Sequence, residues 1–568
     1  MSTTRAVDRP ATTTSPERGR RGGAGRWSAL VGTPRLFRLA LRRDRILLPV
    51  WIGVLVALLA GIASTITALY ASQQDRIAAA MFGAATPATR VFDGPASGTS
   101  LGAMTMVESF GILAILIGLM SGQAVVRHTR HDEETGRAEL LGSAVVGHHA
   151  RLTAALSVVL LANLVLAAGM TGVLLAYDLP VRGSVASGLA FAGVGMTFAA
   201  IAAVAAQVAS TQRAANGIVG AAIGAAFLLR AIGDLFGEVA ASEVELVSAW
   251  PSWLSPIGWG QQVRPFHQDN LEVFALFAGL TVVLVAVAFV LTEHRDVGHG
   301  MLPVPTGPAR ADGLDSPMAL AWRLHRGSLL AWAVGIAVVA VAFGSVGDAA
   351  DDILTENEQL QEALASLTSD GGLRDAFFAF MMAFVGVGAA GFTVQTLLRA
   401  RNEEIAGRLE PLLATPVSRS RWLGGHVVFA AAGTVAIFVL AGLSAAVTYG
   451  FVTGDFAVGV RGLGSAALVQ LPAALALGGG VVLAFALAPR WAVTIGWGAL
   501  TLSLVLGQLG AVLDLPQWVL NVSPFTHVPL VPAAPMAWLP VGVLLAVAAA
   551  LSAAGFALFR RRDLAIGA

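Results

Sequence analysis

The chain has 568 residues, of which 56% are apolar and 12% are charged, and its formal net charge is +1. Soluble domains carry roughly 25% charged residues, so this composition indicates an integral protein of the lipid bilayer and gives no sign of nucleic-acid binding. The chain has no cysteine, which excludes disulfides, thiolate metal sites and cysteine nucleophiles.

All 36 basic residues are arginines. A phosphate-binding P-loop needs a lysine, so the chain cannot hold a standard nucleotide-hydrolysing site. We therefore expect no catalytic residue, cofactor or metal site in it.

The first 33 residues form a polar, arginine-rich tail, which we predict to be disordered because it lacks the apolar residues of a core. Arg20-Arg21 are typical of a twin-arginine export signal, but the next 24 residues contain six further arginines and no uninterrupted apolar run. A cleaved signal peptide is therefore not expected.

Two proline-led stretches, Pro34 to Asp44 and Pro317 to Arg326, stand at the start of the two halves of the chain. In and directly after the first stretch, Arg35, Arg38, Arg42 and Arg45 fall on one helical face. This pattern predicts an interfacial elbow helix with its arginines at the lipid phosphates. The alternative is a plain arginine-rich flank of a membrane span.

Twelve apolar runs approach the roughly 20 residues that a membrane-spanning helix needs. They lie near 46–70, 102–126, 153–176, 187–209, 215–234, 271–292, 327–346, 375–398, 424–449, 464–487, 492–511 and 537–559. If both termini are in the cytosol, the inner segments hold 29 arginines and the outer segments hold six. Cytosolic loops of membrane proteins are enriched in arginine, so we predict a multi-pass protein of the plasma (inner) membrane with both termini cytoplasmic.

The two halves repeat the same order of features, which predicts an internal duplication over 34–300 and 316–568 with a cytoplasmic linker at 301–315. Each half has an elbow, a charged inner segment after its second span, a Trp- and Pro-rich outer segment before its last span, and a closing Arg-Asp pair. The expected fold is an all-α polytopic membrane protein with 12 transmembrane helices as two parallel six-helix repeats. The acidic outer segment Asp348 to Asp370 also predicts a short amphipathic helix.

The clearest duplication is the charged inner segment between the second and third spans of each half. The first copy contains Glu133, Glu134, Gly136, Arg137 and Glu139, and the second contains Glu403, Glu404, Gly407, Arg408 and Glu410. In each copy a Glu stands four residues before the Arg, so one interpretation is a solvated helix with an i,i+4 ion pair. The other is a pair of docking points for a partner protein, because both halves keep this pattern at the same place.

Two outer segments complete the pattern. They read Leu254-Ser255-Pro256-Ile257-Gly258-Trp259-Gly260-Gln261-Gln262-Val263-Arg264-Pro265-Phe266 and Ser523-Pro524-Phe525-Thr526-His527-Val528-Pro529. Together with the elbows and the duplicated inner segments, they make residues 34–568 resemble the ABC-2-type permeases described as polyketide-antibiotic exporters. The combination with the paired Ser-Pro segments makes the resemblance specific, because charged inner loops alone occur in many transporters.

The resemblance implies an ABC-2 or type V exporter-like fold and a permease subunit that extrudes amphiphilic antibiotic or drug-like molecules. It also implies a separate ATP-binding-cassette ATPase, acting as a homodimer, which would carry the ATP and Mg. Segments 132–146 and 403–417 would contain the coupling helices that seat on this ATPase. The second copy has an extra residue, Ala406, and Pro411 in place of Leu140, so we expect the two docking points to bind with unequal strength.

Polar residues inside the spans are candidates for a substrate path. They are Glu108, Arg230, Asp234 and Gln508. Arg230 and Asp234 stand four residues apart, so a local ion pair within one helix is an equal alternative. Glu108 is either a site for a cationic or polyhydroxylated substrate or a protonated acid that hydrogen-bonds a neighbouring helix.

The Ser-Pro pairs of the two outer segments are candidates for an outer gate. They are Ser255, Pro256, Ser523 and Pro524. We expect these segments to dip back into the membrane and close the path from outside. The tryptophans around them are also typical of interfacial anchors, which is the alternative interpretation.

The main alternative function is an ion-gradient-driven 6+6 secondary transporter with Glu108 as proton carrier. A membrane enzyme is less favoured, because the sequence shows no convergent cluster of catalytic acids or histidines. His128, His131, His148 and His149 gather in the first inner loop, but nothing in the second copy repeats them. We therefore interpret them as part of a solvated loop and not as a metal site.

Overall fold

The computed structural model describes residues 29–95, 97–242, 244–296, 298, 300–301, 316–345, 372–509 and 516–564. Several expectations lie outside the described residues: most of the N-terminal tail, most of the linker, the amphipathic helix at 348–370 and the side chain of Gln508. The chain divides into two compact units, Met1–Ala85 with Thr89–Pro305 and Thr306–Ala568 with Thr86–Ala88, which we call unit 1 and unit 2.

The described residues of unit 1 form helices and one short pair of strands, joined by turns. Its α-helices are α2 (Thr33–Arg43), α3 (Leu47–Leu69), α4 (Gln73–Ala85), α5 (Pro87–Phe92), α6 (Leu101–Val126), α7 (Asp132–Glu134), α8 (Arg137–Gly142), α9 (Ala150–Ala176), α10 (Val181–Val208), α11 (Gln212–Leu235), α12 (Pro256–Gln262) and α13 (Phe274–Glu293). A π-helical turn (Arg127–His131) joins α6 to α7, and 3-10 turns span Trp250–Leu254 and Leu271–Val273. The strands β1 (Glu238–Val239) and β2 (Leu246–Val247) pair antiparallel, which the all-α expectation did not include.

The regular secondary structure among the described residues of unit 2 is helical. Its α-helices are α14 (Pro317–Ser345), α17 (Leu373–Ile405), α18 (Leu409–Leu413), α19 (Arg419–Thr453), α20 (Phe456–Gly459), α21 (Ser465–Leu468), α22 (Leu471–Leu487), α23 (Ala492–Leu509), α24 (Gln517–Leu520) and α25 (Trp538–Arg561). A π-helical turn spans Val460–Gly464, and a 3-10 turn spans Pro524–His527.

Eleven helical segments among the described residues are long and apolar enough to cross a membrane. They are Leu47–Leu69, Leu101–Glu134, Ala150–Ala176, Val181–Val208, Gln212–Leu235, Leu271–Glu293, Pro317–Ser345, Arg374–Ile405, Arg419–Thr453, Phe456–Leu487 and Trp538–Arg561. They confirm eleven of the twelve predicted spans. The twelfth coincides with α23, an apolar helix that falls short of the others in length, and its predicted end at 510–511 lies outside the described residues.

The spans that lie deepest in each unit are rich in small residues. In unit 1 these are α6 and α10, whereas α3 and α13 are mostly exposed, as expected of helices that face lipid. A Cβ atom at Gly118 of α6 would lie 2.7 Å from the ring of Phe198 on α10, so a glycine is needed for the two helices to approach this closely. In unit 2, α17 and the segment that ends in α22 hold the corresponding buried places.

The start of the two units differs. In unit 1, α2 is a separate helix, as the elbow prediction requires. It ends before Asp44, and α3 begins at Leu47. In unit 2, Pro317 is instead the first residue of α14, which continues without a break to Ser345. The prediction of a second, separate elbow is therefore wrong. Its physical reason is that proline is tolerated in the first helical turn and α14 contains no other proline that would break it.

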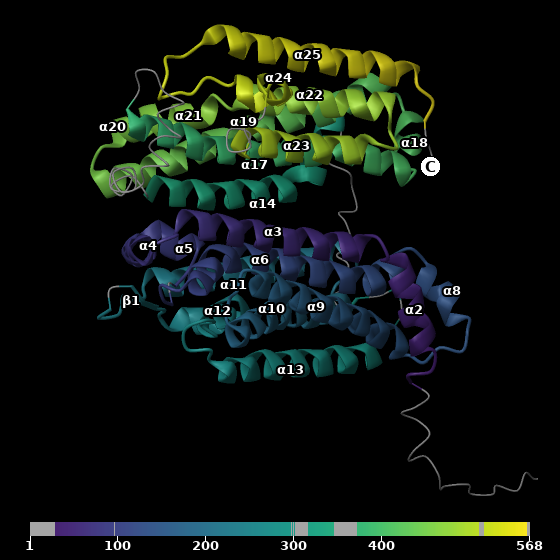
Figure 1. Cartoon of the computed structure of the whole chain (residues 1–568). Helices are drawn as coiled ribbons and strands as arrows, with labels where there is room; N and C mark the ends of the chain where they lie inside the picture. Colours follow the sequence, from purple (N-terminus) through teal and green to yellow (C-terminus); the bar gives the residue numbers. More distant parts are fainter. Residues whose placement is uncertain are drawn as a thin grey trace, which may run out of the picture. The chain divides into compact units, whose positions relative to one another are not determined.

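Figure 1 shows α2 and α8 at one end of unit 1 and α4, α5 and β1 at the other end. In unit 2, α18 and the C-terminal end of α25 share one end, opposite α20. We call the ends that carry α2 and α8 in unit 1, and α18 in unit 2, the inner ends, after the orientation that the arginines predict.

Candidate functional site at the inner ends

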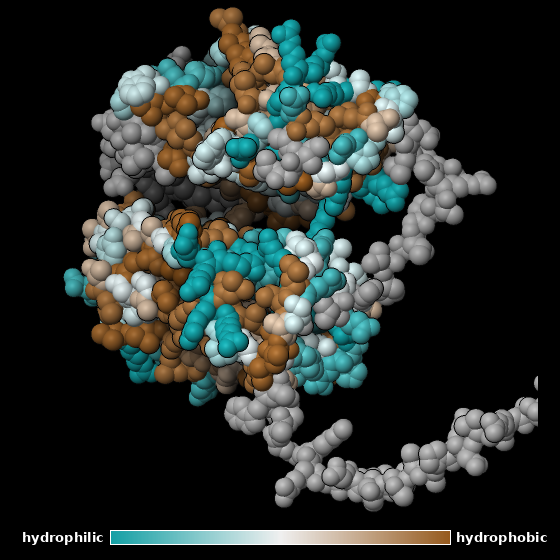
Figure 2. Space-filling model, turned by 90° about the vertical axis from the view of Figure 1, so that its right-hand side faces the viewer, coloured by the Kyte–Doolittle hydropathy of each residue, from teal (hydrophilic) through white to brown (hydrophobic). Residues whose placement is uncertain are grey.

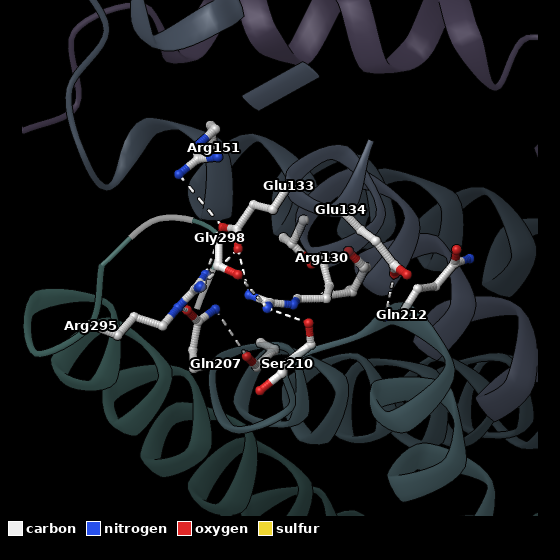
Figure 3. A network of polar contacts seen from close by, with 12 residues as sticks. Arg130, Glu133, Glu134, Arg151, Gln207, Ser210, Gln212, Arg295 and Gly298 are labelled. Carbon is white, nitrogen blue, oxygen red and sulfur yellow. Dashed lines mark hydrogen bonds and ion pairs between the residues drawn. The ribbon is translucent and has the colours of Figure 1, made fainter. Parts of the chain in front are cut away.

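In unit 1, the inner end is organised around the buried carboxylate of Glu133 in α7. Its oxygens accept hydrogen bonds from Arg130 at 2.7 Å and from two nitrogens of Arg295 at 2.6 and 2.7 Å. Arg151 of α9 forms an ion pair with the same carboxylate at 3.6 Å. Figure 3 shows these three arginines converging on Glu133.

The arginines around Glu133 also bind other segments of unit 1. Arg295 donates from Nε to Gln207 of α10 at 2.7 Å, and Arg130 donates to the carbonyl oxygens of Ser210 and Gly298. One buried network thus joins the end of α6, the start of α9, the end of α10 and the segment after α13 (Figure 3). Removing one partner from a buried ion pair costs about 3–5 kcal/mol, so Glu133 is a strong structural tie between these helices.

The two acids beside Glu133 reach different neighbours. Asp132 accepts a hydrogen bond from Arg43, the last residue of α2, at 2.7 Å. Glu134 accepts one at 2.8 Å from the backbone N–H of Gln212, the first residue of α11. A negative charge is favourable there because the N-terminal end of a helix carries a partial positive charge. The inner segment therefore also holds the elbow and the start of α11 in place.

Asp44, which follows α2, adds a second tie to the elbow that the sequence analysis did not identify. Its carboxylate accepts a hydrogen bond from Arg127 at 2.8 Å and lies 2.6 Å from Nε2 of His128. Burial raises the pKa of Asp44, but the hydrogen bonds and charges of His128 and Arg127 outweigh this effect and hold the pKa below its usual value. Asp44 is therefore charged at neutral pH.

The inner segment of unit 1 turns away from the buried network at Gly136. The backbone of Gly136 has a positive φ of 72°, which glycine adopts far more readily than other residues, and this break separates α7 from α8. The described residues show no ion pair between Glu133 and Arg137, so the predicted i,i+4 pair is wrong. Its physical reason is that the two residues do not share one helix. Arg137 instead lies 3.7 Å from Asp132 and is 55% exposed.

The short helix α8 presents a mixed surface beyond this turn. Ala138 is buried against unit 1, whereas Arg137, Glu139 and Leu140 point away and are exposed. Leu140 is 76% exposed, which is unusual for a leucine on the polar side of a membrane protein. We call the exposed residues Arg137, Glu139 and Leu140 the first arm.

In unit 2, Glu404 occupies the position that Glu133 has in unit 1. Its buried carboxylate accepts hydrogen bonds from Arg401 at 3.1 Å and from Arg562, just after α25, at 2.7 Å. Arg401 stands three residues before Glu404, as Arg130 stands three residues before Glu133. Each glutamate thus binds an arginine one turn earlier and an arginine that follows the last helix of its unit.

The segment after Glu404 also resembles its counterpart in detail. Gly407 has a positive φ of 67°, Leu409 is buried, and the exposed Arg408, Glu410 and Pro411 form what we call the second arm. In each copy the glutamate, the glycine and the arginine have the same spacing. Ala406 is therefore not an extra residue, and its interpretation as an insertion is wrong: it aligns with Thr135.

The residue before each buried glutamate differs between the units. Glu403 lies 3.6 Å from Nε2 of His426 and 3.6 Å from Arg399, and His426 in turn lies 3.2 Å from His325 of α14. In unit 1, the matching Asp132 binds Arg43 of the separate elbow. Figure 2, which views the inner ends, shows polar side chains gathered among apolar ones on each unit.

The structure places three of the predicted substrate-path residues, Glu108, Arg230 and Asp234, at the outer part of unit 1. Arg230 and Asp234 are fully buried and lie 3.3 Å apart, and Arg230 also donates to the carbonyl oxygens of Arg90, Val91 and Phe92 at the end of α5. This geometry favours the local ion pair over a path-lining role, because neither side chain reaches an open surface.

Glu108 lies half-buried near Asp93 of the outer segment. Burial, reinforced by the negative charge of Glu108, raises the pKa of Asp93 to about 8 against the opposing effect of Arg230. The described residues form no hydrogen bond with Glu108, so its role as a substrate or proton site stays a prediction.

The predicted gate residues cap helices. Ser255 is buried, and its hydroxyl accepts hydrogen bonds from the N–H groups of Ile257 and Gly258 at the start of α12 and donates to the carbonyl of Ala226 at 2.6 Å. Ser523 accepts one from Phe525 at the start of a 3-10 turn. The prolines Pro256 and Pro524 follow as first residues, where their missing N–H costs nothing. A gating role stays a prediction.

Pro524 also lines a cavity of about 600 Å³ in unit 2. Aliphatic residues of α22, α23 and α25 form most of its wall, and Asn521 and His527 are its polar lining residues. Such a cavity suits an apolar molecule of drug size.

The histidines of the first inner loop do not form a solvated cluster. His128 is buried against Asp44, and His131 lies 2.7 Å from Gln212, so the solvated-loop interpretation is wrong for these two. His148 and His149 lie beside Glu293 at the end of α13. The sequence analysis also missed Arg130 and Arg401, although an Arg-x-x-Glu spacing in both copies was visible.

Comparison with known proteins identifies the family of this chain. Residues 314–560 match the family model described as the C-terminal domain of the multidrug efflux system permease Rv1217c. The multidrug efflux system permease protein Rv1217c of Mycobacterium tuberculosis (strain ATCC 25618 / H37Rv) is 39% identical over 559 residues, which cover 98% of each chain. This chain therefore belongs to the family of the multidrug efflux permease Rv1217c.

Proposed function

We propose that this multidrug efflux permease is an ABC-2-type exporter subunit that is driven by a separate ATP-binding-cassette ATPase. The ATPase docks on the first arm and the second arm. ATP and Mg belong to this partner, because the chain has no lysine with which to form a P-loop. The chain itself supplies the membrane path and the two surfaces on which the partner acts.

The observation that carries the proposal is that both units expose the same short motif on the same kind of anchor. Each arm follows a glycine with positive φ and contains one exposed arginine and one exposed glutamate. Directly before each glycine lies the segment of the buried glutamate that is tied to the last helix of the unit. An exposed motif on a rigid anchor is what a partner needs in order to move a group of helices together.

The two arms support a partner that presents the same surface twice, and hence an ATPase homodimer. They also support a chain built of two parallel six-helix repeats over 34–300 and 316–568, with both arms and both termini on the cytosolic side of the plasma membrane. Charges on the ATPase that complement those of both arms would fix the position in which it docks. ATP binding would bring the two ATPase copies together and push the arms with them.

The buried glutamates explain how this push would reach the helices. In unit 1, Glu133 links the arm through Arg295 to the end of α13 and through Arg151 to the start of α9. In unit 2, Glu404 links the second arm through Arg562 to the end of α25. A movement of an arm therefore shifts the last helix of its unit and does not bend a loose loop.

We propose that the cargo is an amphiphilic, drug-like molecule. The observation in favour is the cavity lined by Pro524, whose wall is mostly aliphatic and whose polar residues, Asn521 and His527, contact each other. A molecule with an apolar body and one polar end fits this distribution, because burying an unpaired polar group among aliphatic side chains is costly.

The test is a charge reversal of both arms. The double variant Arg137→Glu, Arg408→Glu, reconstituted with its ATPase in vesicles, is expected to lose drug-stimulated ATP hydrolysis while it inserts in the membrane at the parental level. The matched control is Arg213→Glu, Arg490→Glu, which reverses one exposed arginine at the start of α11 and one before α23 and is expected to keep stimulation.

Normal stimulation in the arm variant would overturn the proposal. The same vesicles separate it from an ion-gradient-driven transporter. Drug uptake that follows an imposed proton gradient and ignores ATP would assign the chain to that second class.

A further inference from the structure

Three side chains of unit 1 with metal-binding groups meet at its inner end. His148 and His149 precede α9, and Glu293 is the last residue of α13. One ligand atom of each lies within 4.8 Å of the others. Because the histidines and Glu293 are far apart in the sequence, only the fold brings them together. No spacing motif in the sequence predicts this group.

We propose that His148, His149 and Glu293 form a binding site for a divalent transition-metal cation such as Zn²⁺. Two imidazole nitrogens and one carboxylate oxygen are a common three-ligand set for zinc, with a water as the fourth ligand. Two ligands on one tetrahedral zinc are about 3.4 Å apart, and Nε2 of His149 lies 3.4 Å from Oε1 of Glu293. Magnesium and calcium prefer oxygen ligands, so they fit this set poorly.

The ring of His149 is held in place, and its Nε2 atom lies at ion-pair distance from Glu293 without forming a hydrogen bond to the described residues. Its backbone N–H donates to Ala29 at 3.0 Å, and its ring packs 5.1 Å from the ring of Phe289. The Nε2 atom of His149 is buried and makes no hydrogen bond with the described residues. A buried nitrogen of this kind is costly unless it is satisfied, and a metal ion would satisfy it.

The other two side chains leave the site open for an ion to enter. His148 is exposed, with its ring centre 4.1 Å from that of His149. The side chain of Glu293 is 52% exposed. Metal binding would require these two exposed side chains to bring their ligand atoms, which already lie within 4.8 Å of one another and of His149, around one ion.

A metal here would join two segments that Glu133 also joins. Arg151 follows His149 by two residues, Arg295 follows Glu293 by two, and both arginines bind Glu133. The ion would therefore hold the start of α9 to the end of α13 beside the first arm. This effect on the arm rests on the proposed function, whereas metal binding itself does not.

Unit 2 makes the equivalent connection without such a group. Arg419, the first residue of α19, donates to the carbonyl oxygens of Phe559, Arg560 and Arg562 at the end of α25. In unit 1, the corresponding helices are α9 and α13. His149 directly precedes α9, and Glu293 is the last residue of α13. A metal clamp would thus do in unit 1 what an arginine does in unit 2.

The test measures zinc binding directly on the full chain, purified in detergent, freed of affinity tag and stripped with a chelator. Competition with a chromophoric chelator is expected to show one Zn²⁺ per chain. His149→Gln and Glu293→Gln are each expected to weaken binding at least ten-fold, because each removes one of three ligands. The control His294→Gln changes an exposed neighbour of Glu293 that is outside the group and is expected to keep parental affinity.

X-ray absorption of the loaded chain is expected to show only nitrogen and oxygen ligands, with two imidazoles. No saturable binding, or binding that survives Glu293→Gln, would overturn the proposal. Glu293 is half-exposed, so this variant keeps the fold, and an unchanged unfolding temperature without metal verifies this. The arm double variant is expected to bind zinc normally, so failure of the docking proposal and failure of the metal proposal give different results.

Discussion

Glu133 in unit 1 and Glu404 in unit 2 are buried in the same way, yet the acids that precede them have different partners. Each glutamate binds an arginine one turn earlier and an arginine after the last helix of its unit. The preceding residue is Asp132 in unit 1, where it binds Arg43 of the elbow, and Glu403 in unit 2, where it faces His426.

The difference follows the start of each unit. In unit 1, α2 is a separate helix and needs ion pairs to stay attached, whereas in unit 2 the corresponding residues are the first turns of α14 and need none. The comparison teaches that the contact common to both units serves their shared task, while the contact that differs serves the local architecture. Substitutions at the two kinds of position are therefore expected to have different effects.

The largest expected effect is at the shared glutamates. Glu133→Ala and Glu404→Ala each leave buried arginines without their carboxylate, which is expected to lower the free energy of unfolding by about 3–5 kcal/mol. Thermal unfolding of the purified variants in detergent measures this loss.

The neighbouring Glu134 provides the control for these substitutions. Glu134 is exposed and makes one hydrogen bond to the start of α11, so Glu134→Ala is expected to cost about 1 kcal/mol or less. Equal losses in Glu133→Ala and Glu134→Ala would show that the buried network is not the tie described here.

A smaller effect is expected at Asp44, which only unit 1 uses. Asp44→Asn removes a charge that Arg127 and His128 bind, and it is expected to cost about 1–3 kcal/mol at neutral pH. The pKa of Asp44 is lower in the folded chain than its usual value. Its contribution is therefore complete above the pKa of the unfolded chain, about 3.9, and is lost as the pH falls through the lower folded pKa.

Unfolding of the parent and of Asp44→Asn across pH checks this sign. The two curves are expected to differ at pH 7 and to converge below about pH 4. A difference that grows as the pH falls would contradict the assignment of Asp44 as a charged acid.

A small effect on stability is also expected at the glycines before the arms. A Cβ atom at Gly136 or Gly407 would meet no atom within 4 Å, so Gly136→Ala and Gly407→Ala introduce only backbone strain, about 1–2 kcal/mol each. This strain reorients the arms, and stimulated ATP hydrolysis is expected to fall more than stability does. Unchanged stimulation in both variants would mean that the direction of the arms is unimportant.

The sequence predicted the spans well and the side-chain network poorly. Long apolar runs such as 102–126 leave little choice of structure in a membrane, because every backbone N–H and C=O must be bonded within the segment. The separate elbow of unit 1 was also predictable from its arginine face. The continuous α14 was not, because a proline at its first residue is compatible with both a short helix and a long one.

The candidate site was predictable in position but not in its bonding. The duplicated Gly-Arg-x-Glu segments marked where to look, yet the partners of Glu133 come from residues as distant as Arg295, which only the packing of α9, α10 and α13 brings together. The same holds for Glu293 beside His148 and His149. Arg230 was ambiguous in sequence because its partners include backbone carbonyl oxygens of α5, which carry no signal of their own.

The most direct test of the docking proposal uses the absence of cysteine from the chain. Single variants Leu140→Cys and Pro411→Cys place one reactive thiol on each arm, and Arg182→Cys places one on an exposed side chain near the outer end. After attachment of a photoreactive group and illumination in membranes, both arm variants are expected to cross-link to the ATPase subunit and Arg182→Cys is not. Absence of any cross-link from either arm, with the ATPase present and active, would contradict the account.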